Sequence, residues 1–435
     1  MKKKISEKNI KGLVLTLKPD NVQKLLLDKH LNDTRFIYNK YVEEYLKAIK
    51  ENRLPNYKDY QDLRTEYEFL KDSYAWTLQC VLCKFVQTNK INRTKRLKGQ
   101  KVGLIKFRSK KSHSDYFYTQ NIKLSYNLAS KANSCVKIPK IGLVNFEHKN
   151  IKPELLNGKI KFGVIKRTKT GEYKISLCIE VNKVYEERKE NNRIGLDFSL
   201  RDFFVDSFGA KAPEFSTKRS KMELLQEKID SLNTSISEMR NKSKKKRKTS
   251  VKMYRLAIKR NKLYEKVHNV QVDYINKLSR DLCKHNELIV LENLNLHEMS
   301  ERTSYKDSKT TTKGGNHGKS VGLLQWSYFL KKLEENSEKF GNIIVYADKF
   351  FPSSQICSKC GERHTEMKDV RTRTLKRKCG NKIDRDYNSA INLLKFGETV
   401  VYNKSYQTLG KELSEYKAFK CLDFQNQTLK LELSI

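Results

Sequence analysis

The sequence predicts a multidomain α/β protein, and three observations support that class. The chain has 435 residues, the length of two or three domains, and 37% of them are hydrophobic, which is enough for packed cores. Short β-type segments dominate residues 101–185, whereas apolar residues at helical spacing dominate residues 31–100 and 215–285. No apolar run approaches the roughly 18 residues that a membrane span needs, so a membrane protein is excluded and a cytoplasmic, nucleoid-associated protein is expected.

The N-terminal part begins with a predicted strand and continues as helix. Residues 11–18 alternate apolar and polar side chains, and apolar residues then follow helical spacing from Phe36 to Ile49 and again over "YEFLKDSYAWTLQCVLCKFVQ". Cys80 and Cys83 lie inside this second helix among Leu, Val and Phe, so we predict packing rather than metal binding for them.

Residues 101–185 change to short β segments separated by Gly and Asn. The predicted strands are "KVGLIKF", "SCVKIP", "GLVNFEH", "KIKFGVIKR" and "YKISLCIEV". Short strands at this spacing indicate a β-barrel.

The next predicted feature is a helical hairpin over residues 215–285. Apolar residues from Met222 to Met239 alternate spacings of three and four, and a second stripe runs from Leu256 to Leu282. The basic segment "KSKKKRK" separates the two stripes. We therefore predict two antiparallel helices with a positively charged tip.

The positive charge of the chain is clustered. Lys and Arg number 90 against 50 Asp and Glu, a formal charge of +40, and three basic runs at 90–111, 242–260 and 371–382 contain no acid. One such run is most often a solvated loop, but three together favour a surface that binds nucleic-acid phosphates in a salt-dependent way. The partner is therefore predicted to be anionic.

Carboxylates follow predicted strands at three places about 95 residues apart. Asp197 follows the apolar start of "IGLDFSLRDFFVDSFG", Glu292 ends "ELIVLE", and Asp384 and Asp386 precede the helix "NSAINLL". Taken alone, Asp197 is equally consistent with a structural Asp in a β-turn. A helix N-cap is a structural role for one of the last two acids, but not for both. Together, however, they suggest a carboxylate cluster that holds two divalent ions, Mg²⁺ or Mn²⁺, for phosphodiester hydrolysis.

The order of these motifs resembles the TnpB family of transposon-encoded proteins, also called OrfB, which are relatives of the type V CRISPR effectors. The resemblance rests on "GLDFSLRDFFVDS", "IVLENLN" and "FFPSSQICSKCG…KCGNKIDRDYNSAINL", and it extends over most of the chain up to about residue 400. It implies a RuvC-like nuclease of RNase H-type fold that cuts DNA chosen by a guide RNA from the transposon end. It places the catalytic and Mg²⁺-binding roles on Asp197, Glu292 and Asp386.

The resemblance also implies a domain organisation. Residues 1–30 and 101–185 would form a wedge β-barrel, with a helical recognition lobe at 31–100 inserted in it. Residues 190–350 and 383–400 would form the nuclease domain, interrupted by a zinc-finger-like insertion at 351–382, and residues 401–435 would form a C-terminal tail.

The first two domains are expected to bind guide RNA and to read a short motif beside the target in double-stranded DNA. Base reading is assigned to Gln79, Thr119 and Gln120, which lie in "AWTLQ" and "FYTQN". Further nucleic-acid contacts are predicted for six basic residues of the first two basic runs: Lys106, Arg108, Lys110, Lys111, Lys245 and Arg247. The protein is expected to act as a monomer without a membrane partner.

The zinc finger departs from the family pattern of four cysteines. Cys357 and Cys360 form the first pair and Cys379 ends the second, but Lys376 stands where the fourth cysteine is expected. Three states remain open for Zn²⁺: a Cys₃His site completed by His364, a three-thiolate site completed by water, and an empty finger.

Two functions from different classes follow. The first is an RNA-guided DNA endonuclease of a transposon, and the alternative is a cleavage-impaired RNA-guided DNA-binding protein, either a repressor or a degraded transposon copy. A cleavage-dead descendant would be expected to lose a carboxylate, and all three are present, so the sequence favours the enzyme.

Overall fold

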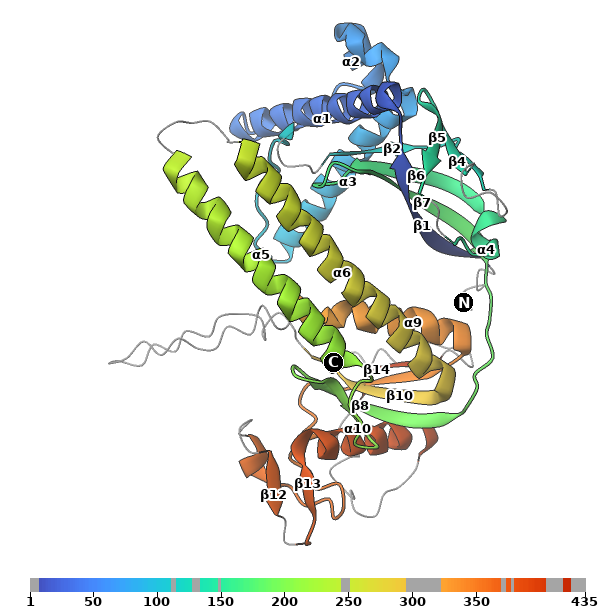
Figure 1. Cartoon of the computed structure of the whole chain (residues 1–435), viewed down its shortest axis with the longest axis vertical. Helices are drawn as coiled ribbons and strands as arrows, with labels where there is room; N and C mark the ends of the chain where they lie inside the picture. Colours follow the sequence, from blue (N-terminus) through green and yellow to red (C-terminus); the bar gives the residue numbers. More distant parts are fainter. Residues whose placement is uncertain are drawn as a thin grey trace. The chain divides into compact units, whose positions relative to one another are not determined.

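The computed structural model describes residues 8–110, 115–126, 134–147, 150–243, 251–294, 322–368, 373–376, 379–403 and 418–423. The chain folds into two compact units, residues 1–183 and 184–435, each with its own sheet and helices (Figure 1). Within the described residues, no helix has both the length and the apolar character needed to cross a membrane.

The first unit contains one antiparallel sheet of seven strands in the order β2-β6-β7-β1-β5-β4-β3. Its strands are β1 (Lys8–Lys18), β2 (Tyr116–Thr119), β3 (Lys123–Ser125), β4 (Cys135–Ile138), β5 (Gly142–Phe146), β6 (Lys159–Arg167) and β7 (Tyr173–Asn182). Alternate residues of β7 are buried, as expected for a sheet with one face on a core. Among the described residues β2 and β3 remain the two edges, so the expected barrel is present as an open sheet.

Helices of the first unit pack beside this sheet and form a second core of their own. They are α1 (Asn21–Lys50), α2 (Tyr60–Glu66), the 3-10 helix η1 (Glu68–Asp72), α3 (Ala75–Leu97) and the short α4 (Pro153–Leu156). Asp20 caps α1, because its carboxylate accepts the Gln23 N–H at 2.8 Å and the Gln23 side chain reaches back to the Asp20 N–H. The predicted division at residue 30 falls inside the continuous α1.

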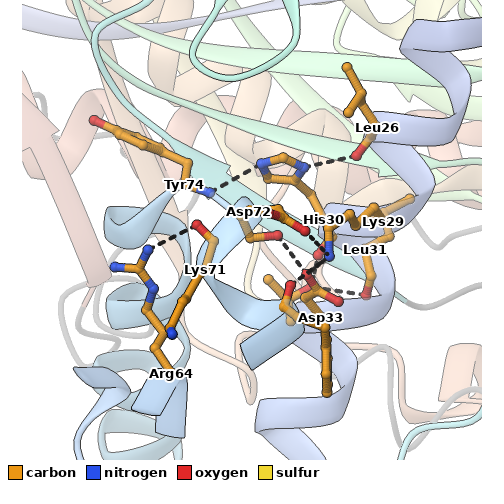
Figure 2. A network of polar contacts seen from close by, with 12 residues as sticks. Leu26, Lys29, His30, Leu31, Asp33, Arg64, Lys71, Asp72 and Tyr74 are labelled. Carbon is orange, nitrogen blue, oxygen red and sulfur yellow. Dashed lines mark hydrogen bonds and ion pairs between the residues drawn. The ribbon is translucent and has the colours of Figure 1, made fainter. Parts of the chain in front are cut away.

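A buried histidine joins α1 to the start of α3. His30 Nδ1 lies 2.8 Å from the Leu26 carbonyl oxygen, and Nε2 lies 3.2 Å from the Tyr74 amide nitrogen (Figure 2). The amide can only donate, so Nε2 is the acceptor and Nδ1 carries the proton. Burial lowers the pKa of His30, which agrees with a neutral ring.

One predicted strand is wrong. Residues 101–107, "KVGLIKF", form no strand, and Leu104 and Phe107 are exposed. Ile105 alone of these is inserted into the helical core, beside Phe85 and Leu78. The segment is therefore held by Ile105 and by the Arg96 guanidinium, which donates to the Val102 and Gly103 carbonyl oxygens, instead of by a ladder of backbone hydrogen bonds.

The second unit is built on a five-stranded sheet in the order β14-β11-β10-β8-β9, in which β10 is parallel to both β8 and β11. The strands are β8 (Asn192–Ser199), β9 (Phe203–Asp206), β10 (Asn286–Glu292), β11 (Ile343–Ala347) and β14 (Ala418–Asp423). β14 pairs antiparallel with β11, so the segment expected to be a tail contributes an edge strand to this sheet.

Helices cover both faces of this sheet. They are α5 (Phe215–Ser243), α6 (Val251–His285), α9 (Trp326–Phe340) and α10 (Arg385–Tyr402), and a small finger adds η4 (Thr365–Lys368), β12 (Thr374–Lys376) and β13 (Lys382–Asp384). The predicted helical hairpin is present as α5 and α6 (Figure 1). Its tip, with Lys245 and Arg247, lies outside the described residues, as does Lys111.

The alternation of β10 determines which helix each side chain faces. Ile289 and Leu291 belong to the core formed with α6 and α9, whereas Leu288 and Val290 belong to the core formed with α10. Because neighbouring side chains of a strand point to opposite faces, Glu292 points to the α10 face.

Candidate active site and cysteine cluster

Asp197 lies within β8 on the face that is covered by α10. Ile194 and Leu196 pack on the opposite face, and Gly195 lies against α10: a Cβ there would overlap the Ala390 carbonyl oxygen and lie 2.7 Å from the Leu394 amide nitrogen. The Asp197 side chain is buried, and the Ser389 hydroxyl on α10 donates to its Oδ1 at 2.7 Å. The carboxylate is thus fixed from the helix side.

Glu292 is the last residue of the neighbouring strand. Leu291 is in register with Leu196 of β8, so the next residues along the two parallel strands, Glu292 and Asp197, lie side by side on one face. The Ser353 hydroxyl donates to Glu292 Oε1. The buried Asp197 and the partly buried Glu292 therefore lie next to each other on the α10 face of the sheet.

Burial and mutual repulsion determine the charge state of this pair. Burial raises the pKa of Asp197 well above its ordinary value, and the neighbouring Glu292 carboxylate raises it further. Burial also raises the pKa of Glu292, against the opposing effect of the Ser353 hydroxyl. Two carboxylates in such a position favour a bound cation, because a positive charge would replace their repulsion by attraction.

Asp386 lies in the first turn of α10, not at the end of a sheet strand. Asp384 is the N-cap of this helix, since its Oδ1 accepts the Asp386 N–H at 2.9 Å and the Tyr387 N–H at 3.3 Å. Burial raises the pKa of Asp386, and the Arg373 guanidinium opposes this shift. The sequence left open which of the two acids, Asp384 or Asp386, caps the helix, and the structure shows that it is Asp384.

The carboxylates of Asp197, Glu292 and Asp386 influence one another's pKa, but their oxygen atoms are not all close enough together to bind one ion. Asp386 raises the pKa of both Asp197 and Glu292, which places all three in one electrostatic neighbourhood. We searched the described residues for sets of three or more Asp, Glu, His or Cys residues whose ligand atoms all lie within 4.8 Å of one another. The only such set there consists of three cysteines.

That group consists of Cys357, Cys360 and Cys379, and the Cys357 and Cys379 sulfurs are 3.7 Å apart. Burial opposes ionisation of Cys357, but hydrogen bonds from Asn381 and from backbone N–H groups lower the pKa of its thiol to about 7. Burial raises the pKa of Cys360 to about 11. Three sulfurs, one of them close to ionising, are a suitable donor set for Zn²⁺.

His364 does not belong to this group of ligand atoms. Its Nε2 lies 3.7 Å from a Glu362 oxygen, and its N–H backbone group donates to the Gln355 carbonyl oxygen. Of the three sequence alternatives, the geometry of the described residues therefore favours a three-thiolate site over Cys₃His.

The cysteine cluster is tied directly to α10. Asn388 accepts the Ser358 N–H at 2.9 Å and donates to the Ile356 carbonyl oxygen at 2.7 Å, while Asn392 donates to the Ser353 carbonyl oxygen at 2.7 Å. Ser353 in turn holds Glu292. Displacement of the finger would therefore be transmitted to the carboxylates.

The sequence did not identify the residues that position the carboxylates, namely Ser353, Ser389 and Arg373. Ser389 could have been found, because it follows Asp386 by three residues in "DRDYNS" and so lies one helical turn further on the same face. Ser353 and Arg373 come from the finger, and no local pattern indicates their contacts.

The predicted nucleic-acid residues of the first unit lie in different environments. Gln79, Lys106 and Lys110 are exposed and Gln120 is partly buried. Thr119 is only 1% exposed, so its side chain does not face solvent in this structure. Arg108 stacks on Tyr38, with 3.7 Å between the guanidinium carbon and the ring centroid.

Three family models match the chain, together over more than half of its length. OrfB_IS605, described as "Probable transposase", matches residues 176–303; HTH_OrfB_IS605, "Helix-turn-helix domain", matches residues 10–53; and "Cas12f1-like, TNB domain" matches residues 326–393. In this structure residues 10–53 contain β1 and the single helix α1 instead of two helices.

A protein of Streptomyces pristinaespiralis named "Putative RNA-guided DNA endonuclease" is 26% identical over 136 residues. The match covers 31% of this chain and 31% of that protein, so it spans about a third of the relative's length.

Two solved structures match the chain at low similarity. A Cas12f1–sgRNA–target DNA complex is 15% identical with a TM-score of 0.49, covering 89% of this chain and 99% of that one. A CRISPR-Cas12f ternary complex is 15% identical with a TM-score of 0.32, covering 86% and 81%. These scores are too low to establish a common fold, whereas the family models are specific: the chain belongs to the OrfB family of transposon-encoded proteins, also called TnpB.

Proposed function

We propose that this protein is an RNA-guided DNA endonuclease of its transposon. It would hydrolyse phosphodiesters of target DNA at Asp197, Glu292 and Asp386. The observation that carries the proposal is the register of β8 and β10, which sets Asp197 and Glu292 side by side beneath the helix that carries Asp386.

The sheet order supports a RuvC-like domain of RNase H type. A central parallel pair, β8 and β10, is extended by the antiparallel hairpin partner β9 on one side and by the parallel β11 on the other. The catalytic acids of such a domain lie on the two central strands and on a helix across one face, which matches the positions of the three carboxylates here.

The donor set suits Mg²⁺ or Mn²⁺. Its atoms are carboxylate oxygens, which hard divalent cations prefer, and a bound cation would oppose the burial that raises the pKa values of Asp197 and Glu292. Asp197, Glu292 and Asp386 would hold the ions, which supply an activated water and stabilise the departing 3′ oxygen.

The surrounding residues keep these acids in place. Ser389 and Ser353 each donate one hydrogen bond to a carboxylate, which fixes the orientation of that carboxylate. Arg373 and Arg385 bring positive charge to the same end of α10, where a DNA phosphate would approach.

The first unit would bind the guide RNA and the short motif beside the target, as wedge and recognition regions. Exposed Gln79, Lys106 and Lys110 remain candidates for such contacts. The cysteine cluster would hold one structural Zn²⁺ and keep the finger docked on α10.

The test uses the full chain expressed together with RNA transcribed from its transposon end. The purified complex is incubated with Mg²⁺ and plasmids that carry a guide-matched target flanked by randomised bases. We expect cleavage of plasmids that share one flanking motif. If RNA copurifies and no plasmid in the library is cleaved, the chain is not an active endonuclease.

A further inference from the structure

Two sulfurs of the cysteine cluster lie in van der Waals contact. Cys357 Sγ and Cys379 Sγ are 3.7 Å apart, and a disulfide bond is about 2.05 Å long, so the two atoms would have to close by less than about 2 Å to form one. The Cys360 sulfur lies within 4.8 Å of both. The finger therefore brings together two thiols that can be joined covalently.

Hydrogen bonds fix the position of Cys357. Its N–H donates to the Glu362 carbonyl oxygen at 2.9 Å, and its carbonyl oxygen accepts the Gly361 N–H at 2.9 Å. The Asn381 side-chain amide donates to its sulfur at 3.5 Å. A disulfide between Cys357 and Cys360 would have to form inside this hydrogen-bonded turn, whereas Cys379 approaches from outside it.

The two cysteines in contact belong to different halves of the finger. The half with Cys357 is fixed to α10, because Asn388 Oδ1 accepts the Ser358 N–H at 2.9 Å and Lys395 Nζ donates to the Ser358 carbonyl oxygen at 2.5 Å. Cys379 lies on the other half, five residues before the N-cap of α10. A covalent bond between the sulfurs would therefore join the segment that leads into α10 to the half that is fixed on this helix.

The two sulfurs differ in their exposure to solvent. Cys379 is partly exposed, whereas Cys357 is buried. A small oxidant such as hydrogen peroxide therefore meets Cys379 first, and Cys357 lies behind it as the thiol that can attack the oxidised sulfur. An accessible cysteine with a second thiol beside it is the usual arrangement of a redox-active pair.

We propose that Cys357 and Cys379 are a redox-active pair that hydrogen peroxide converts into a disulfide. Peroxide transfers one oxygen to the Cys379 thiol, which becomes a sulfenic acid, and the rest of the peroxide leaves as water. The Cys357 sulfur then attacks the Cys379 sulfur. The S–O bond breaks, and the hydroxyl leaves with the Cys357 proton as a second water. In total the two thiols lose two electrons and two protons, and one peroxide gains them.

The disulfide takes over from zinc as the link between the two halves of the finger. A zinc ion bound to the cluster would lose two of its three sulfur ligands and dissociate. Lys376 stands where the family has a fourth cysteine, and three sulfurs hold an ion through fewer protein bonds than a closed four-ligand site does. The covalent bond would keep the finger on α10 after the ion has left.

The test treats the full, reduced chain with hydrogen peroxide. Free thiols are then blocked with N-ethylmaleimide, and the denatured chain is digested with trypsin without reduction. Trypsin cleaves after Lys359 and Lys378, so the three cysteines fall on the separate peptides 350–359, 360–363 and 379–382. We expect mass spectrometry to find peptide 350–359 joined to peptide 379–382, in an amount that increases with the peroxide concentration.

Two serine variants test which cysteines react. In Cys379→Ser the buried Cys357 has no partner across the finger, so the rate at which peroxide protects Cys357 from N-ethylmaleimide should fall at least about tenfold. Cys360→Ser is the matched control, because it also removes one sulfur from the cluster, and it should form the same disulfide as the wild type. Thermal melting in reducing buffer checks that each variant is folded.

Hydrogen exchange tests whether the disulfide keeps the finger on α10. The Ser358 N–H donates to Asn388, so it is protected while the two halves stay together. After peroxide and a metal chelator, the peptide that contains this amide should exchange more slowly in the wild type than in Cys379→Ser.

Two results would overturn the redox pair: a disulfide that joins peptide 350–359 mainly to peptide 360–363, and a Cys357 that stays free while Cys379 is oxidised to sulfinic acid. Equal hydrogen exchange of the Ser358 peptide in the two proteins would overturn the link to α10. None of these readouts requires DNA cleavage, so they test the pair separately from the proposed nuclease.

Discussion

Arg373 of the finger contacts both carboxylate oxygens of Asp386: its Nη1 lies 2.9 Å from Oδ1 and 2.7 Å from Oδ2. Asp386 is one of the three acids proposed to hold divalent ions, and a metal ligand needs a free oxygen. The guanidinium and the ion therefore compete for the same carboxylate.

This competition predicts that Arg373→Ala lowers the Mg²⁺ concentration for half-maximal cleavage. The Arg373 side chain is 59% exposed, so the ion pair contributes about 1 kcal/mol or less, and the shift should be at most about fivefold. Cleavage rates measured over a Mg²⁺ titration check it. Arg363→Ala is the matched control, because Arg363 lies in the same finger and contacts the neutral Gln355. An unchanged or higher Mg²⁺ requirement in Arg373→Ala would refute the competition.

Gly195 predicts a stability effect at the place where β8 approaches α10. An alanine Cβ there would overlap the Ala390 carbonyl oxygen, so Gly195→Ala should lower the free energy of unfolding of the second unit by about 1–3 kcal/mol. Urea unfolding measures the loss. Gly322→Ala is the control, because a Cβ at Gly322 meets no atom within 4 Å, and its stability should match the wild type. Equal stability of both variants would show that the helix and strand are not in close contact.

The cysteine cluster predicts one tightly bound zinc per chain. Cys357 is buried, its thiol has a pKa lowered to about 7, and its sulfur lies within reach of two others, so Cys357→Ser should lose the metal. Cys83→Ser should keep it, since Cys83 is exposed on α3 and outside the group. Elemental analysis after dialysis gives the answer, and a wild-type protein without zinc would contradict the assignment.

His30 predicts a pH dependence of stability in the first unit. Burial lowers the pKa of His30 below its ordinary value of 6.5, so the unfolded chain binds the proton more readily than the folded one. The contribution of the neutral ring is therefore complete above pH 6.5 and is lost as the pH falls below it toward the lowered pKa.

The measurement is urea unfolding of wild type and His30→Gln at about pH 7.5 and about pH 5.5. The wild-type protein should lose more free energy of unfolding than the variant between these two pH values. Only the wild type has an imidazole that takes up a proton more readily in the unfolded chain than in the folded one. If the variant loses as much, or if the His30 pKa measured by NMR is 6.5 or higher, the neutral hydrogen-bonded ring is wrong.

The parts of the fold that the sequence predicted depend on local periodicity. The stripe from Met222 to Met239 became α5, and the apolar run before Glu292 became the central strand β10. Asp197 and Glu292 could be paired in advance because acids that follow buried parallel strands gather at one edge of the sheet.

The parts that it missed depend on long-range contacts. The local pattern of residues 101–107 is typical of a strand, but among them only Ile105 packs in the helical core. Thr119 looked exposed in "FYTQN", although the alternation of β2 buries it. β14 could not be foreseen, because its pairing with β11 joins residues that are more than seventy positions apart.

The central claim is that Asp197 is a catalytic carboxylate of an RNA-guided nuclease. The most direct test compares cleavage of a guide-matched plasmid by wild type, Asp197→Asn and the control Asp202→Asn, whose acid pairs with Lys211 outside the site. We predict that Asp197→Asn binds RNA and target DNA like the wild type while its cleavage rate falls by at least about a thousandfold, and that Asp202→Asn cleaves normally. Cleavage by Asp197→Asn at the wild-type rate would contradict the account.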